Sequence, residues 1–553
     1  MSTTETDAVI IGSGAAGAVI AKRLSDDGIN VVCLEQGDWV HPHEHPHSHD
    51  EWELEKLRGW SFDPNMRNLP EDYPVTGDAT TMMFNAVGGS TVHYLAFWPR
   101  MKPVDFRKGT EHGLGNTIDW PISYEELEPY YAQAEHDVGI SGFQGDPAYP
   151  AMGPKPGGPS IAPGISGLRG IRAFDELGWH WFPGDNAIVT GNGHKGRLPC
   201  NACGNCSSGC PRGSMGSMHV THWPQALANG VDLRTSARVS QVLLDAKGLA
   251  DGVEYIDMRT DERHQVKAKM VFLCASGIGS PRLLQLSAQR GHPDGLANSS
   301  GQVGHNLMHH TYAFMDIWLE EPMYGWQGGF GGNSYSHEFY DTDTSRGFAN
   351  GFTLFAGNGR SYGAGMQSNG FATGYMTPWG NGHREFFDSH FGFHNLVGVQ
   401  GEDLPMYDNA VTLDPEATDS SGLAAPHIEY KLCEHDKRLT EYGAARAVEV
   451  AEAMGAVESN PTGVVWPPPA WHLMGTARMG NTPEDSVVNK YHQTWDVPNL
   501  FVCDGSSLAT GGAVNPTCTI SALALRCADY VARRQSDILS QTTTPSNADA
   551  PGF

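Results

Sequence analysis

The stretch DAVIIGSGAAGAVIAKRLSDDGINVVCLE, residues 7–35, decides the fold of this chain. Residues 7–11 form an apolar run that predicts a buried strand. Residues 15–27 have the apolar spacing of a helix, and residues 30–35 predict a second strand. A strand, a helix and a second strand in this order predict a βαβ unit at the start of the chain.

The turn between the first strand and the helix has the spacing G-x-G-x-x-G of dinucleotide-binding proteins. Gly12 permits the tight turn, Gly14 lets a pyrophosphate approach the backbone, and Gly17 lets the helix pack closely on the strand. Glu35 ends the second strand, where its carboxylate can accept both ribose hydroxyls of an adenosine. The predicted dinucleotide-binding residues are Gly12, Gly14, Ala15, Ala16, Gly17 and Glu35. These residues alone leave FAD and NAD open.

The bulk composition limits the possible partners. With 553 residues the chain exceeds one compact core, so we expect two domains. A formal net charge of −27 disfavours binding to nucleic acid and to anionic membranes. The first residues, MSTTETDAVIIGSG, show no secretory signal, and no apolar run is long enough to span a membrane. We therefore expect a cytoplasmic protein.

Further patterns predict the remaining architecture. Residues 119–138 and 436–456 have helical spacing, whereas the aromatic-rich and glycine-rich stretch 311–430 predicts an antiparallel sheet with long loops. The histidine-rich segment HPHEHPHSHD, residues 41–50, is polar and contains two prolines, which predicts a surface loop rather than a metal site. The polar residues 536–553 predict a disordered tail.

Five further segments resemble the glucose–methanol–choline (GMC) oxidoreductase family. They are NAVGGSTVHY (85–94), CASGIGSPRLLQLS (274–287), DLPMYDNAVTLDP (403–415), WHLMGTARMG (471–480) and SVVNKYHQTWDVPNLFVCDGSSLATGGAVNPTCTISALALR (486–526). The resemblance implies a doubly wound, Rossmann-like FAD-binding domain and a substrate domain on an antiparallel sheet, α/β in class and α+β overall. The FAD-binding domain would comprise residues 1–120, 195–310 and 462–535, and the substrate-binding domain residues 121–194 and 311–461.

The same resemblance assigns further cofactor-binding residues. It implies that Gly88, Gly89 and Ser90 lie along the flavin and the pyrophosphate, and that Val239 lies at the adenine. Asp504 and Gly505 would hold the ribityl and phosphate region, and Asn515, Pro516 and Thr517 would lie beside the pyrimidine end of the flavin.

His93, five residues after Gly88, is the position at which some family members bind the flavin covalently. We therefore expect either an 8α-histidyl bond or a histidine packed against the dimethylbenzene edge.

By family position, His472 and Asn515 form the active-site pair, 43 residues apart. Oxidation of an alcohol transfers a hydride to flavin N5 and releases a hydroxyl proton, which needs a base that titrates near working pH. We expect His472 to be that general base. Asn515 cannot take a proton, but its amide can stabilise developing alkoxide charge.

A cysteine cluster has the spacing C-x₂-C-x₂-C-x₃-C-P, which bacterial ferredoxins use for iron–sulfur clusters. Its members are Cys200, Cys203, Cys206 and Cys210. A structural thiol loop, a zinc site and disulfides remain alternatives. A cluster would favour a dehydrogenase that passes electrons to a partner rather than to dioxygen.

These expectations describe an FAD-dependent enzyme that oxidises an alcohol group of a sugar, polyol or other alcohol. The electron acceptor is left open between dioxygen, a quinone and a redox partner. Two alternatives are a flavin-containing lyase of the same fold, such as a hydroxynitrile lyase, and a non-catalytic binding protein. Candidate pocket residues are Trp326, Tyr335, His337, Tyr340, Trp379, His390 and His394.

Overall fold

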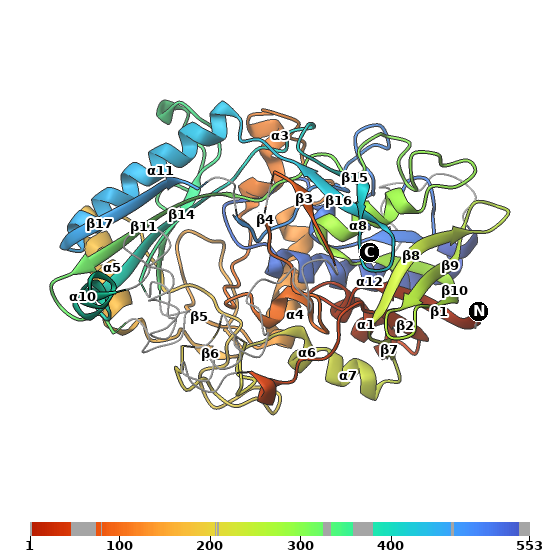
Figure 1. The fold of residues 1–553 in the computed structure, drawn as a ribbon, viewed down its shortest axis with the longest axis horizontal. Coiled ribbons are helices and arrows are strands. Elements are labelled where there is room, and N and C mark those ends of the chain that lie inside the picture. The colour runs from red at the N-terminus through yellow and green to blue at the C-terminus, as the bar shows by residue number, and fades with distance from the viewer. Residues whose placement is uncertain are drawn as a thin grey trace.

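Two large sheets of different construction lie at the two ends of the molecule in Figure 1. The computed structural model describes residues 3–45, 73–78, 80–204, 206, 209–324, 333–357, 380–465 and 469–540. Each of the two sheets contributes to a separate hydrophobic core cluster.

The first sheet has the strand order β7-β2-β1-β10-β9-β8, with β19 beside the second half of β10. Its strands are β1 (Thr3–Ile11), β2 (Val31–Leu34), β7 (Asp232–Arg234), β8 (Ala237–Leu244), β9 (Ala250–Asp257), β10 (Glu262–Leu273) and β19 (Leu500–Val502). β1 pairs in parallel with both β2 and β10, whereas β9 runs antiparallel to β10 and β8 antiparallel to β9. The predicted βαβ unit and the doubly wound α/β class are confirmed.

Helices complete the core around this sheet. They are α1 (Gly17–Asp26), α4 (Tyr124–Val138), α6 (Met218–Thr221), α7 (Trp223–Ala228), α8 (Ser276–Leu286) and α12 (Thr517–Ser540). α12 packs against both α1 and α4. The start of α4 is fixed by a capping box, in which the Ser123 hydroxyl accepts from the Glu126 N–H and the Glu126 carboxylate accepts from the Ser123 N–H.

The second sheet is antiparallel and has the order β12-β13-β14-β11-β17. Its strands are β11 (Thr311–Leu319), β12 (Ser334–Ser336), β13 (Phe352–Gly357), β14 (His394–Gly401) and β17 (Ala456–Val464). α11 (Glu434–Ala453) packs on β11, β14 and β17, and α5 (Gly164–Leu177) packs on β12 and β13. The predicted antiparallel sheet and the predicted helix near 436–456 are confirmed.

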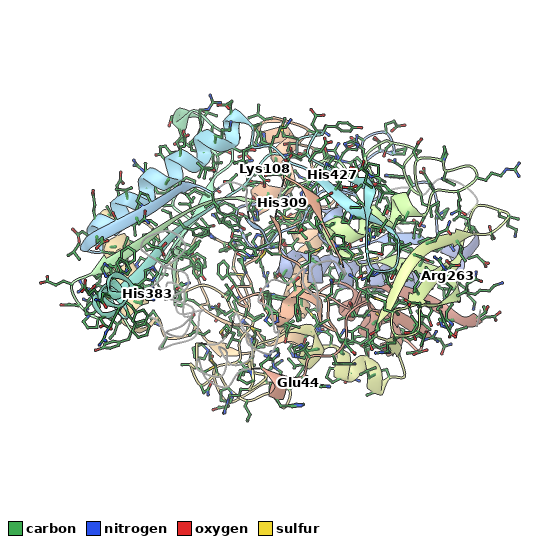
Figure 2. All side chains as sticks on the ribbon, in the orientation of Figure 1. Glu44, Lys108, Arg263, His309, His383 and His427 are labelled. Carbon is green, nitrogen blue, oxygen red and sulfur yellow. The ribbon has the colours of Figure 1, made fainter. Side chains whose placement is uncertain are left out.

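Three small sheets complete the strands. They contain β3 (Thr76–Gly77), β15 (Ala410–Thr418) and β16 (Ala424–Glu429); β4 (Thr80–Thr81) and β18 (Pro469–Ala470); and β5 (Ser141–Gly142) and β6 (Gly158–Pro159). The remaining helical segments are α3 (Lys108–Glu111), α10 (Asn381–His390) and the 3₁₀ turns Pro42–Glu44, Gly89–Val92, Pro103–Arg107, Thr344–Arg346 and Gly505–Ser507. Figure 2 shows Lys108 and His309 in the middle of the molecule, between the two large sheets.

Three details differ from the sequence-based expectations. α10 is a helix inside the stretch expected to form only strands and loops. β17 runs through residue 462, the expected domain boundary. α12 continues to Ser540, so the first residues of the expected disordered tail are helical, and residues 541–553 lie outside the described part. Among the described residues, every helix is too short or too polar to cross a lipid bilayer.

Candidate active site

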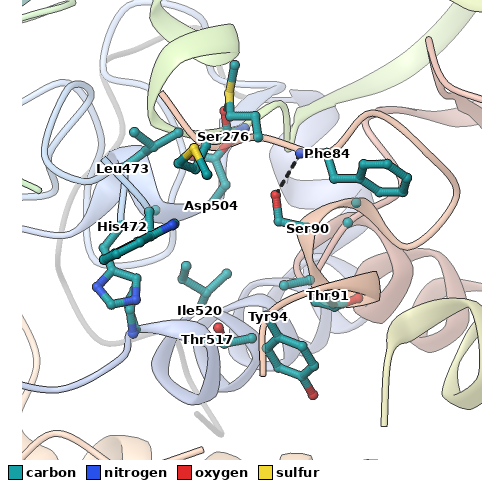
Figure 3. A pocket seen from close by; sticks show the side chains of 18 of the residues that line it. Phe84, Ser90, Thr91, Tyr94, Ser276, His472, Leu473, Asp504, Thr517 and Ile520 are labelled. Atoms are coloured by element: carbon teal, nitrogen blue, oxygen red, sulfur yellow. Dashed lines mark hydrogen bonds between the residues drawn. The ribbon is translucent and has the colours of Figure 1, made fainter. Parts of the chain in front are cut away.

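A cavity of about 590 Å³ lies between the turn after β1 and one face of the antiparallel sheet. This volume is typical of sites for small molecules and cofactors. Figure 3 shows His472 on one side of the cavity and Ser90 and Tyr94 on the other. The predicted site residues that line it are Gly12, Gly14, Ala15, Ala16, Glu35, Gly89, Ser90, His93, Val239, His472, Asp504, Gly505, Asn515, Pro516 and Thr517.

The glycine-rich turn has the geometry of a dinucleotide cradle. A methyl group at Gly14 would meet only the Cα of Gly89 within 4 Å, at 3.8 Å, so this side of the turn is open to the cavity. A methyl group at Gly17 would overlap the carbonyl oxygen of Gly12. Gly17 does not line the cavity; it brings α1 close to the turn. The open side at Gly14 fits the approach of a pyrophosphate.

Glu35 is buried and stabilises this turn through hydrogen bonds. One carboxylate oxygen accepts from the Ser13 N–H (2.9 Å) and hydroxyl (2.6 Å), and the other accepts from the Gly37 N–H (2.8 Å). A carboxylate has about four acceptor sites, and these three hydrogen bonds occupy most of them. About one site therefore remains for a ribose hydroxyl, whereas the sequence analysis expected Glu35 to accept from both ribose hydroxyls. Ser13 was not singled out from the sequence.

The segment from Gly88 to His93 forms a second tight turn. Gly88 has φ +97° and directly precedes the 3₁₀ turn Gly89–Val92, and it is not among the residues that line the cavity. The His93 ring lines the cavity and contacts the rings of Phe84 and His45 edge to face, with centroids 4.3 and 5.8 Å away. His45 is buried, which corrects the expectation that its whole segment is a surface loop. Residues 46–50 of that segment lie outside the described part.

Asp504 ties two turns of the cavity wall together. One carboxylate oxygen accepts from the Ser506 N–H (2.8 Å) and hydroxyl (2.5 Å), and the other from the Ser276 N–H (3.0 Å) and the Ser280 hydroxyl (2.6 Å). Burial raises the pKa of Asp504, and these hydrogen bonds oppose that shift. Asn515 and Pro516 directly precede α12, so the amino end of this helix faces the cavity.

The predicted active-site pair meets at one side of the cavity. The Asn515 side-chain nitrogen lies 3.1 Å from His472 Nε2. On the other side of the ring, His310 Nδ1 and the Tyr312 hydroxyl lie 2.7 and 3.0 Å from His472 Nδ1. Burial, followed by the nearby rings of His310 and His309, holds the pKa of His472 well below its usual value of 6.5. His472 is therefore a neutral imidazole, the form that can accept a proton.

A row of polar side chains crosses the antiparallel sheet beside His472. Tyr312 on β11 and Thr353 on β13 each stand opposite Gln400 on β14, so the three side chains share one face. Thr353 donates its hydroxyl to the Ala513 carbonyl (2.7 Å). Gln400 is buried, and its side-chain nitrogen has no hydrogen-bond partner within the described residues.

The next row along the sheet is apolar. Phe314 on β11 and Phe355 on β13 stand opposite Gly398, whose missing side chain leaves room for the Phe355 ring. Trp471, 43% exposed, contacts Tyr312 edge to face and stands at the edge of the cavity. On the side of the antiparallel sheet, the lining residues that sequence reasoning missed include Tyr312, Phe314, Asn333, Thr353, Phe355, Gln400 and Trp471. Alternation within residues 311–315 was a usable signal for two of them.

Most of the aromatic and histidine candidates lie elsewhere. Tyr335 lines the cavity as expected. Tyr340 donates its hydroxyl to Asp105 in the core, His394 pairs with Asp316, and His390 stacks on Phe386. His337 is buried against Phe182. Those four residues therefore make structural contacts and do not line the cavity. Trp326 and Trp379 lie outside the described residues.

The four clustered cysteines surround a second, small cavity together with Ile188 and Met215. Cys200 Sγ accepts from the Ala202 N–H (3.3 Å), and Cys210 Sγ accepts from the Met215 N–H (3.5 Å). A single zinc ion holds its thiolates about 4 Å apart. Within the described residues, three ligand atoms lie within 4.8 Å of one another only at Cys433, His435 and Asp436. The cysteine loop is thus more open than a closed zinc site.

Comparisons with known proteins show to which family the chain belongs. Residues 6–312 and 405–524 match the models of the GMC oxidoreductase family. The chain is 58% identical, over the full length of both, to 2-methyl-1,2-propanediol dehydrogenase of Mycolicibacterium austroafricanum. It is 30% identical to the fructose dehydrogenase large subunit of Gluconobacter japonicus, over 96% of this chain and 98% of that one.

Solved structures support the same fold. A formate oxidase variant from Aspergillus oryzae RIB40 superposes with a TM-score of 0.67 over 97% of this chain and 99% of that one, at 15% identity. At that identity the likeness concerns the fold alone. The matches to the family models and the full-length relatives decide the assignment: this chain belongs to the GMC oxidoreductase family and is an FAD-dependent oxidoreductase that acts on alcohol groups.

Proposed function

We propose that this protein is a dehydrogenase that oxidises the primary alcohol group of a short, branched 1,2-diol. The two rows of the sheet beside His472 carry this proposal. The polar row of Tyr312, Gln400 and Thr353 suits adjacent hydroxyl groups, and the apolar row of Phe314 and Phe355 suits alkyl substituents. A sugar carries hydroxyl groups all round and fits this division less well.

The relative with 58% identity supports the same substrate class, because it is a dehydrogenase of 2-methyl-1,2-propanediol. The flavin-containing lyase, which the sequence left as an alternative, receives no support from the relatives described above.

The reaction needs a base and an oxyanion partner, and we assign these roles to His472 and Asn515. Bound FAD supplies the hydride acceptor, flavin N5. His472 Nε2 takes the proton of the substrate hydroxyl, and the Asn515 amide, 3.1 Å from that nitrogen, donates to the oxygen as charge develops. The open side of the turn at Gly14, the Glu35 carboxylate and the amino end of α12 would hold the cofactor.

Gln400 would bind the second hydroxyl of the diol. Its buried side-chain nitrogen lacks a partner within the described residues, and a buried donor without a partner is costly. A substrate hydroxyl would remove that cost, whereas an alcohol without the second hydroxyl would leave it in place. Such a site rejects the incomplete substrate strongly.

Anaerobic flavin reduction tests this assignment. The substrates are 2-methyl-1,2-propanediol, 2-methyl-1-propanol, which lacks only the second hydroxyl, and fructose. We expect kcat/KM for the diol to exceed that for the mono-alcohol by at least about 10-fold. Gln400→Leu should reduce this ratio by about 10-fold, because the variant keeps the volume and loses the amide. Fastest reduction by fructose, or an unchanged ratio in Gln400→Leu, would refute the diol assignment.

Two finer features of the cofactors are also proposed. His93 would carry a covalent flavin bond, and its place in the cavity lining supports this proposal. Protein that stays yellow after acid precipitation would support the bond, as would colourless His93→Ala protein. Cys200, Cys203, Cys206 and Cys210 would hold an iron–sulfur cluster, since all four line one small cavity and two of their sulfurs accept backbone hydrogen bonds. Such a cluster would carry single electrons.

A further inference from the structure

His310 is held rigidly beside the catalytic histidine, at the start of β11. Its backbone N–H and that of His309 donate to the two carboxylate oxygens of Asp403, each at 2.9 Å. The Tyr430 hydroxyl donates to the same carboxylate at 2.6 Å. His310 has φ +66°, a left-handed conformation that is uncommon for residues other than glycine and costs some free energy.

The hydrogen bonds of His310 determine where its own proton lies. His310 Nε2 is 2.6 Å from the Gly512 carbonyl oxygen. A carbonyl only accepts, so Nε2 must carry a hydrogen. His310 is fully buried, and burial lowers its pKa, so the ring is neutral. A neutral imidazole with its hydrogen on Nε2 has a bare Nδ1.

The next hydrogen bond transfers this constraint to His472. The two Nδ1 atoms are 2.7 Å apart, a separation that requires one proton between them. Because Nδ1 of His310 is bare, the proton belongs to Nδ1 of His472. The Tyr312 hydroxyl oxygen, 3.0 Å from the same nitrogen, is a second acceptor for that proton. His472 Nε2 is then left without a hydrogen on the side of Asn515 and the cavity.

We propose that His310 is a positioning residue that fixes the tautomer of His472, with the proton on Nδ1 and a bare Nε2 toward the alcohol. This inference rests on the proposed role of His472 as the base. A bound flavin would take the hydride, that is, the electron pair of the substrate C–H bond, while Nε2 of His472 takes the hydroxyl proton, so that the alcohol becomes a carbonyl. The resulting imidazolium keeps its Nδ1–H, which donates to the bare Nδ1 of His310 in a charge-assisted hydrogen bond.

Two variants separate this role from simple packing. His310→Leu fills the site without an acceptor, whereas His310→Asn offers an amide oxygen near the position of Nδ1 and tolerates the left-handed backbone. We expect the limiting rate of anaerobic flavin reduction to fall about 100-fold or more in His310→Leu and about 10-fold or less in His310→Asn. The substrate concentration at half-saturation should change little in both, because ground-state binding is retained.

A measurement on the unmodified holoenzyme removes any dependence on folding of the variants. Selective ¹⁵N-histidine labelling, with His472 assigned by comparison with His472→Ala, distinguishes protonated from bare ring nitrogens. We expect Nδ1 of His472 to be protonated and Nε2 to be bare. The reverse pattern, or wild-type rates in His310→Leu, would overturn the role of His310. Wild-type flavin reduction in His472→Ala would instead overturn the proposed function itself.

Discussion

The environment of a single residue, His472, determines how the reaction should depend on pH. Its ring is enclosed by His310, Tyr312 and Asn515, and burial holds its pKa well below 6.5. A general base works only when it is unprotonated. A lowered pKa means that the base stays unprotonated as the pH falls through 6.5, so the loss of activity on the acid side must begin below that value.

We therefore predict that the rate constant of anaerobic flavin reduction stays constant from pH 9 down to about pH 6.5 and declines only at lower pH. Stopped-flow measurement of flavin bleaching from pH 5 to pH 9 provides the test, with FAD absorbance at each pH as the control for cofactor loss. A decline centred at pH 7 or above would show that the pKa of His472 is not lowered, and would contradict the buried environment described for its ring.

At the scale of one element, two glycines of the turn between β1 and α1 have different roles: Gly14 leaves space for the cofactor, and Gly17 allows α1 to pack closely on the turn. A methyl group at Gly14 would enter open space with only Gly89 nearby, whereas one at Gly17 would overlap the Gly12 carbonyl. We predict that Gly14→Ala lowers FAD affinity by at least about 10-fold while leaving the stability of the apoprotein nearly unchanged. Gly17→Ala should destabilise the apoprotein by about 1–3 kcal/mol, because α1 is pushed away from β1.

Flavin titration and thermal denaturation of the two apoproteins compare these variants directly. They differ in position by three residues and carry the same methyl group, so each is the control for the other. Equal loss of apoprotein stability in both variants would contradict the open space at Gly14. Unimpaired FAD binding by Gly14→Ala would contradict the location of the pyrophosphate.

Elements with strong local signals were predictable from the sequence, and contacts between distant elements were not. The strand at 7–11, the helix after it and the helix near 436–456 follow from short periodic patterns. The polar row of Tyr312, Thr353 and Gln400 does not follow from such a local pattern. Gln400 lies opposite the other two residues only because of strand pairings that span 88 and 47 residues. His310 was overlooked for a similar reason: its partners Asp403 and Gly512 are distant in the chain.

At the scale of the whole molecule, residues of both halves line the cavity, and contacts between side chains extend from the cavity to the cysteine loop. The cavity lies between the α/β sheet and the antiparallel sheet, so both halves supply its walls. On the far side of His93 stands the ring of His45, and a methyl group at Gly209 of the cysteine loop would overlap that ring. A continuous set of contacts therefore runs from the cavity through His93 and His45 to the loop.

This arrangement gives the cluster proposal a measurable consequence. Ordering a loop with few apolar residues costs conformational entropy, which metal–thiolate bonds would offset. We predict about three or four irons per chain in protein prepared without oxygen. Cys206→Ser should lose this iron, whereas Cys527→Ser, the same substitution in α12 outside the loop, should keep it. Reduced flavin should then reoxidise slowly with dioxygen and rapidly with one-electron artificial acceptors. Iron-free anaerobic protein that forms one hydrogen peroxide per substrate oxidised would instead identify an oxidase whose cysteine loop is structural.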